Sequence, residues 1–416
     1  MKKVAKTASF VLLLLSGWFG PEKVSAQSQL VFLRLKGLAV DGTPTGAASD
    51  LQVVGDLAYL AWDGLQIFSL SNPPAPMWVG GYSSGVAANA IEVLGQYAYL
   101  AEGAFQTLTN DPGTVEIIDV SKAANPVRVG GISTLGRAQD IRIAGKYAYV
   151  AESTRWTGTN LLGALEIFDV STPTNPLRVA IFDTAGAATS VDISGDYAYV
   201  ADGVTDLQVL NVSHPGNPQR VGVYGSDVLH NACGFEPGGP AKYVKVVGNL
   251  AYSAGENGLH VLDISDPSHP ASIGDNFCFP IQSLFISGHL VYATVWSSYA
   301  NTYILGVLNA MDPANLIGVG RKENWNSPVF QVVGNLVYLA TNPLSVYEIS
   351  DRPAITSLSV NNQSLLLTWD YAPGFVLQRA ITMADPQWSD VPGSTNATAI
   401  ELPLSSGSEF FRLTRP

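Results

Sequence analysis

A five-residue signature recurs along this chain and constrains its fold more than any other feature. The signature reads Gly-x-(Leu/Tyr)-(Ala/Val)-Tyr and ends at Tyr59, Tyr99, Tyr149, Tyr199, Tyr252, Tyr292 and Tyr338. Successive tyrosines are 40 to 53 residues apart, a period typical of repeats that each form one small four-stranded sheet. The chain is therefore built from seven repeats, which we number one to seven.

Each repeat divides into four short strands. In repeat three, Ile141–Ile143 precedes the glycine and Tyr147–Ala151 follows it, and Leu165–Val170 and Leu177–Ile181 come later. The glycine suits a tight turn, and the Ser-Thr-Pro-Thr-Asn-Pro run at 171–176 has the residues of a second turn. Sheets of this size, repeated seven times, predict an all-β fold: a seven-bladed β-propeller.

The two ends of the repeat region complement each other. Repeat seven has no fourth strand, because residues 350–353 lead directly into a different pattern. Residues 30–40 have the pattern of a strand but precede the first signature. We expect this N-terminal strand to complete the seventh sheet and close the propeller, which would leave no open edge at the seam. Repeat six departs from the usual turn at 308–313, where we expect an irregular sheet.

Several segments resemble a known repeat family. AYVAES with LEIFDVSTPTNP, AYVADG with LQVLNVSHPGNP, and AYSAGENG with LHVLDISDPSHP are similar to the bacterial LVIVD-repeat family. The resemblance covers about residues 30–353 and implies an exported or surface β-propeller. It implies no particular biochemical role.

The C-terminal residues have a different pattern. LLLTWD at 365–370, FVLQRA at 375–380 and EFFRLT at 409–414 resemble strands of a fibronectin type III-like sandwich, although the segment is shorter than that module. We therefore divide the chain into a targeting segment at 1–26, a propeller at 27–353 and a small β-sandwich module at 354–416.

Residues 1–26 have the pattern of a secretory signal peptide. A basic start with Lys2, Lys3 and Lys6 precedes the apolar run Phe10–Leu15, and Val24-Ser25-Ala26 offers a cleavage site. The apolar run is shorter than the roughly 20 residues that span a bilayer. We expect cleavage near Ala26 and a secreted, periplasmic or cell-surface protein with no membrane span.

The charge of the chain argues against some partners. Removing residues 1–26, which carry four lysines and one glutamate, changes the net charge from -12 to -15. So acidic a chain repels phosphate backbones, which argues against nucleic acid.

A repeated polar position lies three residues before each turn glycine. It holds Gln52, Glu92, Arg142, Asp192, Lys245 and Gln331, with Phe285 as the exception. Repeats two to five alternate acid and base there, and neighbouring repeats should place these side chains side by side. This predicts ion pairs of structural purpose between sheets, with Glu92 close to Arg142. By the same logic, the tyrosine of each signature should pack between neighbouring sheets.

Strand alternation places the glycine turns and the Ser-Pro turns at one face of the propeller. The loops between strands two and three, and the connections between repeats, then lie at the opposite face, which we call the loop-bearing face. Its loops vary in length, and variable loops on a rigid scaffold usually carry binding. The candidate ligand-binding residues are Phe105, Arg155, Trp156, Trp296, Tyr299, Tyr303 and Trp325. The alternative is that the loops fold back and bury these aromatic rings.

Other residues have two interpretations. Asp63, Glu102, Glu152 and Asp202 each follow a second strand and form either a calcium-binding ring at the channel mouth or a set of turn caps. Cys233 and Cys278 lie in consecutive connections between repeats, where they form a disulfide or remain as two thiols.

The sequence offers little for catalysis. The five histidines are scattered, and no zinc spacing, phosphate-binding glycine loop or nucleophile elbow occurs. We expect no cofactor other than possible calcium, and a non-enzymatic binding or scaffold function that engages a protein or glycan at the cell surface. The alternative is a hydrolase or lyase of extracellular polysaccharide that uses carboxylates at the channel mouth.

Overall fold

The structure is a computed structural model. It describes residues 32–38, 48–103, 112–156, 161–225, 241–256, 258–273, 280–297, 301–325, 327–341, 344–350, 355–360, 364–369, 376–380, 387–395, 397, 399–403 and 410–414. Every regular element in these residues is a β-strand. The predicted targeting segment at 1–26 lies outside them. No helix with the length and apolar character needed to cross a membrane occurs among the residues described.

The chain forms two compact units. Leu35–Glu348 belong to the first, and Ile349–Pro416 belong to the second together with Gln27–Arg34. The first unit contains the seven repeats, and the second contains the predicted C-terminal module.

The repeats form antiparallel sheets in chain order. The first two repeats contain β2 (Asp50–Val54), β3 (Leu57–Ser69), β4 (Met77–Leu94), β5 (Tyr97–Glu102), β6 (Thr114–Asp119) and β7 (Val127–Ser133). Repeats three and four contain β8 (Ala138–Ala144), β9 (Tyr147–Trp156), β10 (Leu161–Asp169), β11 (Leu177–Asp183), β12 (Ser190–Ser194), β13 (Tyr197–Ala201), β14 (Leu207–Asn211) and β15 (Gln219–Tyr224).

The remaining repeats follow the same plan. Repeats five to seven contain β16 (Ala241–Val247), β17 (Leu250–Gly255), β18 (Gly258–Asp263), β19 (Ala271–Ser272), β20 (Ile281–Ser287), β21 (Leu290–Ser297), β22 (Thr302–Asn309), β23 (Ile317–Trp325), β24 (Phe330–Val333), β25 (Leu336–Leu339) and β26 (Ser345–Ser350). The N-terminal strand β1 (Phe32–Leu38) lies beside β26, in the order β1-β26-β25-β24.

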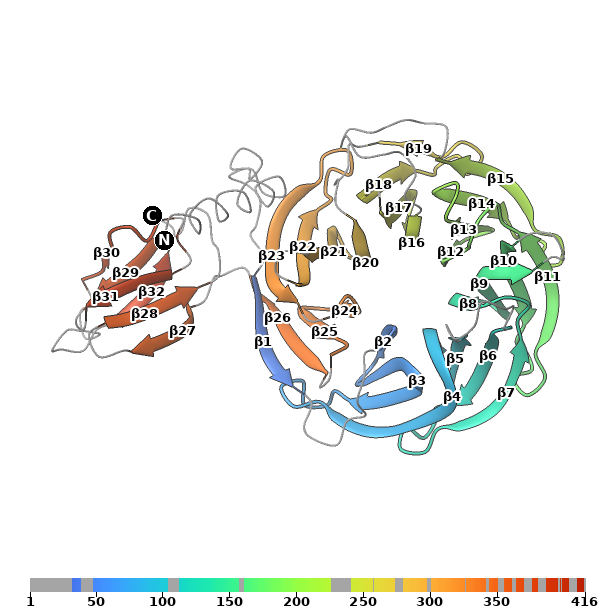
Figure 1. Cartoon of the computed structure of the whole chain (residues 1–416), viewed down its shortest axis with the longest axis horizontal. Helices are drawn as coiled ribbons and strands as arrows, with labels where there is room; N and C mark the ends of the chain where they lie inside the picture. The colour runs from blue at the N-terminus through green and yellow to red at the C-terminus, as the bar shows by residue number, and fades with distance from the viewer. Residues whose placement is uncertain are drawn as a thin grey trace. The chain divides into compact units, whose positions relative to one another are not determined.

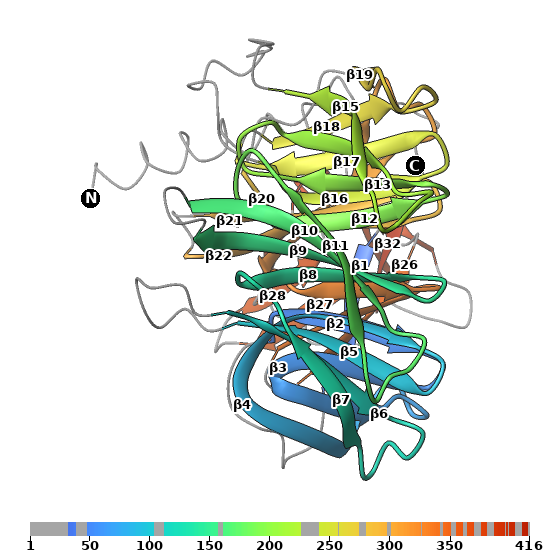
Figure 2. The same ribbon diagram turned by 90° about the vertical axis from the view of Figure 1, so that its right-hand side faces the viewer.

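One strand belongs to two repeats. The first part of β4 pairs with β3, and from Ala88 onward β4 pairs with β5, which joins repeats one and two into one six-stranded sheet. Figure 1 shows the sheets of this unit arranged around a common centre, with β16, β20 and β24 nearest to it and β11, β15 and β23 outermost. Seen from the side, the strands of successive sheets run in similar directions (Figure 2).

The turn that opens each repeat requires glycine. All seven signature glycines have φ between 56° and 62°, in the left-handed region that side chains disfavour. This conformation lets the first strand fold back directly onto the second, so that the register of each sheet is set at this turn.

The signature tyrosines pack between sheets, as the sequence predicts. All seven are at least 95% buried. Tyr199 shares a core cluster with Val209 of its own repeat and with Val244 and Leu262 of the next. Burial raises the pKa of Tyr199 and of Tyr292 to about 12. The rings therefore join neighbouring sheets.

Repeat six forms a four-stranded sheet with register shifts like those of repeat three, so the departure at 308–313 does not make its sheet exceptional, contrary to expectation. Its four strands pair in the order β20-β21-β22-β23. Asn309 Oδ1 accepts a hydrogen bond from the Met311 N–H at 2.9 Å, in the same way that Asp169 Oδ1 accepts one from the Ser171 N–H at 2.9 Å. The amide oxygen replaces the usual carboxylate, so the turn keeps its shape.

The second unit contains two three-stranded antiparallel sheets. Their orders are β27-β28-β31 and β30-β29-β32, from β27 (Ile355–Val360), β28 (Ser364–Trp369), β29 (Val376–Ala380), β30 (Ser389–Asp390), β31 (Ala399–Pro403) and β32 (Phe410–Thr414). Leu367 of one sheet and Leu377 of the other share a buried core with Val391.

The seven signature tyrosines, which we call the tyrosine layer, give the first testable prediction. Tyr199→Ala removes a ring buried between two sheets and should lower the free energy of unfolding by about 3 kcal/mol, as other large-to-small core substitutions do. Tyr199→Phe keeps the ring and is the matched control. Urea unfolding of the wild type and both variants measures the effect. Equal stability of the Ala and Phe variants would contradict a packing role.

Candidate functional site

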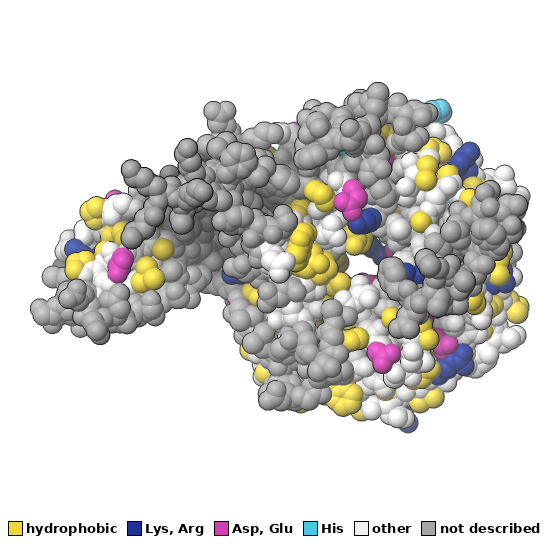
Figure 3. Space-filling model, viewed as in Figure 1, with side chains coloured by type: hydrophobic (Ala, Val, Ile, Leu, Met, Phe, Trp, Pro, Cys, Tyr) yellow, Lys and Arg dark blue, Asp and Glu magenta, His cyan; other side chains and the backbone are white. Residues whose placement is uncertain are grey.

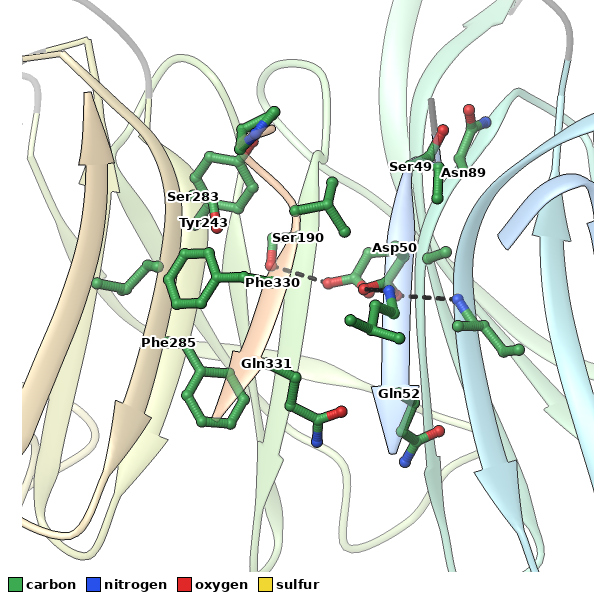
Figure 4. Close-up of a pocket in the computed structure, with 18 of the residues that line it drawn as sticks. Ser49, Asp50, Gln52, Asn89, Ser190, Tyr243, Ser283, Phe285, Phe330 and Gln331 are labelled. Atoms are coloured by element: carbon green, nitrogen blue, oxygen red, sulfur yellow. Dashed lines mark hydrogen bonds between the residues drawn. The ribbon is translucent and has the colours of Figure 1, made fainter. Parts of the chain in front are cut away.

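A cavity of about 440 Å³ lies at the centre of the first unit. Residues of all seven inner strands, β2, β4, β8, β12, β16, β20 and β24, line it. Figure 3 shows an opening at this centre with charged side chains near its edge. Figure 4 shows Phe285, Phe330 and Tyr243 on one side of the cavity and Asp50 and Gln52 on the other.

The inner strands have a free edge, and side chains cover much of it. An edge strand exposes backbone N–H groups that no neighbouring strand binds. The position three residues before the turn glycine supplies acceptors: Gln331 accepts from the Val53 N–H, Gln52 from the Val93 N–H, and Asp192 from the Val246 N–H. Each side chain thus binds the inner strand of the next repeat.

A second position, five residues before the turn glycine, does the same. Asp50 accepts from the Ile91 N–H at 3.0 Å, and Asp140 accepts from the Val191 N–H at 3.1 Å. Ser190 accepts from the Val244 N–H at 3.4 Å. Sequence reasoning missed these residues, although their constant distance from the turn glycine was a signal that could have found them.

Two of the predicted ion pairs between repeats are confirmed, whereas Asp192 and Lys245 form no ion pair of 4 Å or less in the described part of the chain. Arg142 Nη1 lies 3.7 Å from Glu92 Oε2, and Arg142 Nε lies 3.9 Å from Asp192 Oδ1. Asp140 Oδ1 is closer still, at 2.9 Å from Arg142 Nη1. One guanidinium therefore compensates acids from three consecutive repeats.

Burial and charge shift the pKa values of this cluster. Burial raises the pKa of Glu92 to about 7, against the lowering effects of Arg142 and Lys245. Burial also raises the pKa of Asp50, and Arg142 partly opposes that shift. Burial alone would lower the pKa of Arg142, but the carboxylates of Asp140, Glu92, Asp192 and Asp50 raise it. Arg142 therefore stays charged, while Glu92 gains a proton near neutral pH.

The predicted ligand-binding aromatic residues differ in their exposure to solvent. Trp296 is 45% exposed and packs edge to face on Tyr303, with ring centroids 4.8 Å apart. Trp325 is fully buried against Tyr347 and Phe330, so it belongs to the core rather than to the surface. Phe105, Tyr299 and the side chains of Arg155 and Trp156 lie outside the described residues.

Aliphatic side chains accompany the exposed tryptophan. Val86 lies in β4 close to the point where this strand passes from repeat one to repeat two, Leu135 lies between β7 and β8, and Val204 lies between the second and third strands of repeat four. Their exposed fractions are 38%, 43% and 57%, respectively. The antiparallel strand order places all three, like Trp296, at the loop-bearing face.

The candidate metal ligands are mostly buried. Asp202 accepts hydrogen bonds from the Thr205 N–H at 2.7 Å and from Thr205 Oγ1 at 2.9 Å, the geometry of a turn cap. Glu102 and Glu152 are 2% and 0% exposed, and burial raises the pKa of Glu102 to about 7. Asp63 is exposed. Among the described residues no cluster of three or more His, Cys, Asp and Glu is placed to hold a metal ion. The calcium site remains a prediction.

The four predicted calcium ligands are not all brought together. Asp63 and Glu102 interact electrostatically, whereas Glu152 lies in a different repeat and interacts with Glu166. Burial raises the pKa of Glu166, Arg178 and Glu152 partly oppose that shift, and Arg178 Nε lies 3.2 Å from Glu166 Oε2. The predicted disulfide residues, Cys233 and Cys278, lie outside the described residues.

The radial sheets around a lined central cavity define a β-propeller, and solved structures agree. The WD40 beta propeller domain of Doa1 is similar with a TM-score of 0.53 and 7% identity, covering 76% of this chain and 97% of that one. The computationally designed Ika8 protein gives 0.51 and 11%, covering 78% and 99%. A chain of the Mitotic Checkpoint Complex gives 0.52 and 11%, covering 79% and 97%. At such identities the likeness shows the fold alone.

The repeats themselves are recognised more specifically. The LVIVD repeat matches this chain in four places, at residues 45–84, 135–184, 185–225 and 238–275. These stretches correspond to repeats one, three, four and five. No curated protein matches the sequence.

The ion pairs of Arg142 with Glu92, Asp140 and Asp192 predict that replacing this arginine lowers the stability of the fold. Arg142→Met leaves Glu92, Asp140 and Asp192 without their shared counter-charge and should destabilise the fold by about 3 kcal/mol. Arg220→Met replaces an exposed arginine of β15 and should change stability by no more than about 0.5 kcal/mol. Urea unfolding compares the two. Equal, small effects would contradict the compensating role of Arg142.

The raised pKa of Glu92 predicts a pH dependence. The folded protein holds the Glu92 proton more tightly than the unfolded chain, so its contribution to stability is present at low pH and is lost as the pH rises from about 4.5 to about 7. Glu92→Gln should therefore reduce the decline in the free energy of unfolding across this range. Parallel pH profiles for variant and wild type would rule out this contribution.

Proposed function

We propose that this protein is an exported binding or scaffold propeller that engages a protein or glycan partner at the cell surface through its loop-bearing face. The exposed Trp296, which packs edge to face on the half-buried Tyr303, carries the proposal. Large aromatic rings contribute much contact area at low entropic cost, and interfaces concentrate their binding energy on such residues. The exposed Val86, Leu135 and Val204 on the same face favour a protein over a glycan, because sugars stack on rings rather than on aliphatic side chains.

We further propose that the propeller has seven blades and is closed by its N-terminal strand. Tyr338 and Val346 of repeat seven share a core cluster with Leu51 and Phe68 of repeat one. Gln331 of repeat seven binds the Val53 N–H of repeat one, as Gln52 of repeat one binds the Val93 N–H of repeat two and Asp192 of repeat four binds the Val246 N–H of repeat five. The pairing of β1 with β26 supplies the fourth strand that repeat seven lacks. These contacts support closure of the ring between its last and first repeats.

Export and attachment complete the proposal. The basic start, apolar run and small-residue site within residues 1–26 support cleavage near Ala26. The C-terminal residues 354–416, with two small sheets around Leu367 and Leu377, would serve as a fibronectin type III-like spacer or attachment module. Binding is favoured over a hydrolase or lyase because Glu102, Glu152 and Asp202 are buried, so these acids offer no accessible pair to a polysaccharide.

A binding screen tests the proposal. Residues 27–416 are screened against cell-surface proteins and a glycan array, and each hit is titrated with Trp296→Ala. The loss of a central aromatic contact should weaken binding at least about tenfold. Trp78→Ala is the matched control, because Trp78 is 44% exposed on β4 away from the loop-bearing face.

Two outcomes discriminate between the functions. Binding that Trp296→Ala weakens and Trp78→Ala leaves unchanged would support the loop-bearing face as the site. Binding that survives Trp296→Ala unchanged would contradict it. Hydrolysis or cleavage of a polysaccharide on the array would instead favour the enzymatic alternative.

A further inference from the structure

The inner edges of two strands, β20 and β24, lack the side-chain acceptors found elsewhere. In each hairpin, the residue just before the turn glycine forms hydrogen bonds to the second strand, and along an antiparallel strand every second residue does so. The N–H groups of the residues two and four positions before the glycine therefore point away from the second strand, to the free edge of the sheet. Both of these N–H groups are bonded to side-chain oxygens in β2, β4, β12 and β16, and one is bonded in β8. In β20 and β24 the corresponding groups belong to Leu284, Ile286, Phe330 and Val332, and no described residue accepts a hydrogen bond from them.

Three of the four acceptor positions in repeats five and six hold another residue type, and the fourth holds Ser283, the counterpart of Ser190. The two acceptor positions hold Tyr243 and Lys245 in β16, and Ser283 and Phe285 in β20. Lys245 occupies the position from which Gln331, Gln52 and Asp192 bind the next strand, so a donor stands where the other repeats place an acceptor. An ammonium group and backbone N–H groups therefore face the same part of the channel, which is the arrangement that binds an anion.

Lys245 has no counter-charge at contact distance. Within the described part of the chain it forms no ion pair of 4 Å or less, whereas Arg142 is surrounded by Asp140, Glu92 and Asp192. The charge of Lys245 acts at longer range on Glu92, whose pKa it lowers against the effect of burial. Among the described residues that line the cavity, Lys245 is the one basic side chain of β16, β20 and β24.

The same wall is aromatic. Phe285 and Phe330 lie with ring centroids 6.3 Å apart, and both line the cavity together with Tyr243 and Lys245. Figure 4 shows Phe285 at the same level as the amides of Gln331 and Gln52. The oxygen of each amide is used by a backbone N–H, which leaves its amino group as a further donor toward a ligand.

We propose that the central channel binds a small organic carboxylate with an apolar body. Its carboxylate lies against Lys245 and the free N–H groups of β20 and β24, and its apolar body lies against Phe285 and Phe330. A cavity of about 440 Å³ is within the usual size range of small-molecule sites. This site does not depend on the loop-bearing face, so either proposal can fail without the other.

Calorimetric titration of the full chain tests the proposal with hexanoate and phenylacetate as probes. Phenylacetamide, phenethylammonium and inorganic phosphate are the comparison ligands, since they lack the charge, reverse it or lack the apolar body. We expect at least one of the two carboxylates to bind with a Kd below about 1 mM and more tightly than all three comparison ligands.

Lys245→Gln separates ligand binding from a structural role. The variant removes the charge and supplies the amide that Gln52 and Gln331 use to bind the next strand, so its Tm should equal or exceed that of the wild type. Its affinity for the bound carboxylate should fall at least about tenfold. Lys122→Gln, which replaces an exposed lysine, is the matched control and should leave affinity unchanged.

Several results would contradict the proposed carboxylate site. Absence of carboxylate binding below about 1 mM, or equal affinity for phenylacetamide, would overturn the proposal. So would tighter binding of phenethylammonium, or unchanged carboxylate binding by Lys245→Gln. A lower Tm for Lys245→Gln would show that the lysine serves the fold rather than a ligand.

Discussion

Backbone N–H groups at the inner edge of every sheet are the constraint on which the first unit depends. A sheet that ends at the centre of a propeller has no further strand to bind these groups, and leaving them unsatisfied in a confined channel costs free energy. Side-chain oxygens of one repeat bind the N–H groups of the next, as Asp192 binds Val246. The polar lining of the channel is therefore a structural requirement before it is a functional one.

This requirement explains the charges of the channel. Acceptors such as Asp50 and Asp140 bring negative charge into a confined space, and Arg142 compensates them across three repeats. Where the acceptors are replaced by Tyr243, Lys245 and Phe285, the N–H groups of the next strand remain free. Departures from a repeated local rule are where function is most often found, because the stability that they forgo has to be offset by something else.

The loop-bearing face and the channel differ in the size of the partner that each would bind. The face offers the exposed Trp296, packed on Tyr303, together with scattered aliphatic side chains, which suits a large partner. The channel offers directed donors and two phenyl rings in a small volume, which suits a small one. One rigid set of sheets supports both, since the tyrosine layer fixes each sheet against its neighbour.

The sequence alone determined the number of repeats, their strand order, the packing of the signature tyrosines and the pairing of Glu92 with Arg142. Equivalent positions of neighbouring repeats meet in space, so the repeat register predicts these contacts. Only the tertiary structure decided that Trp325, Glu102 and Glu152 are buried. Each of these depends on how a side chain fits against a particular neighbouring sheet, and the local pattern of residues carries no information about that fit.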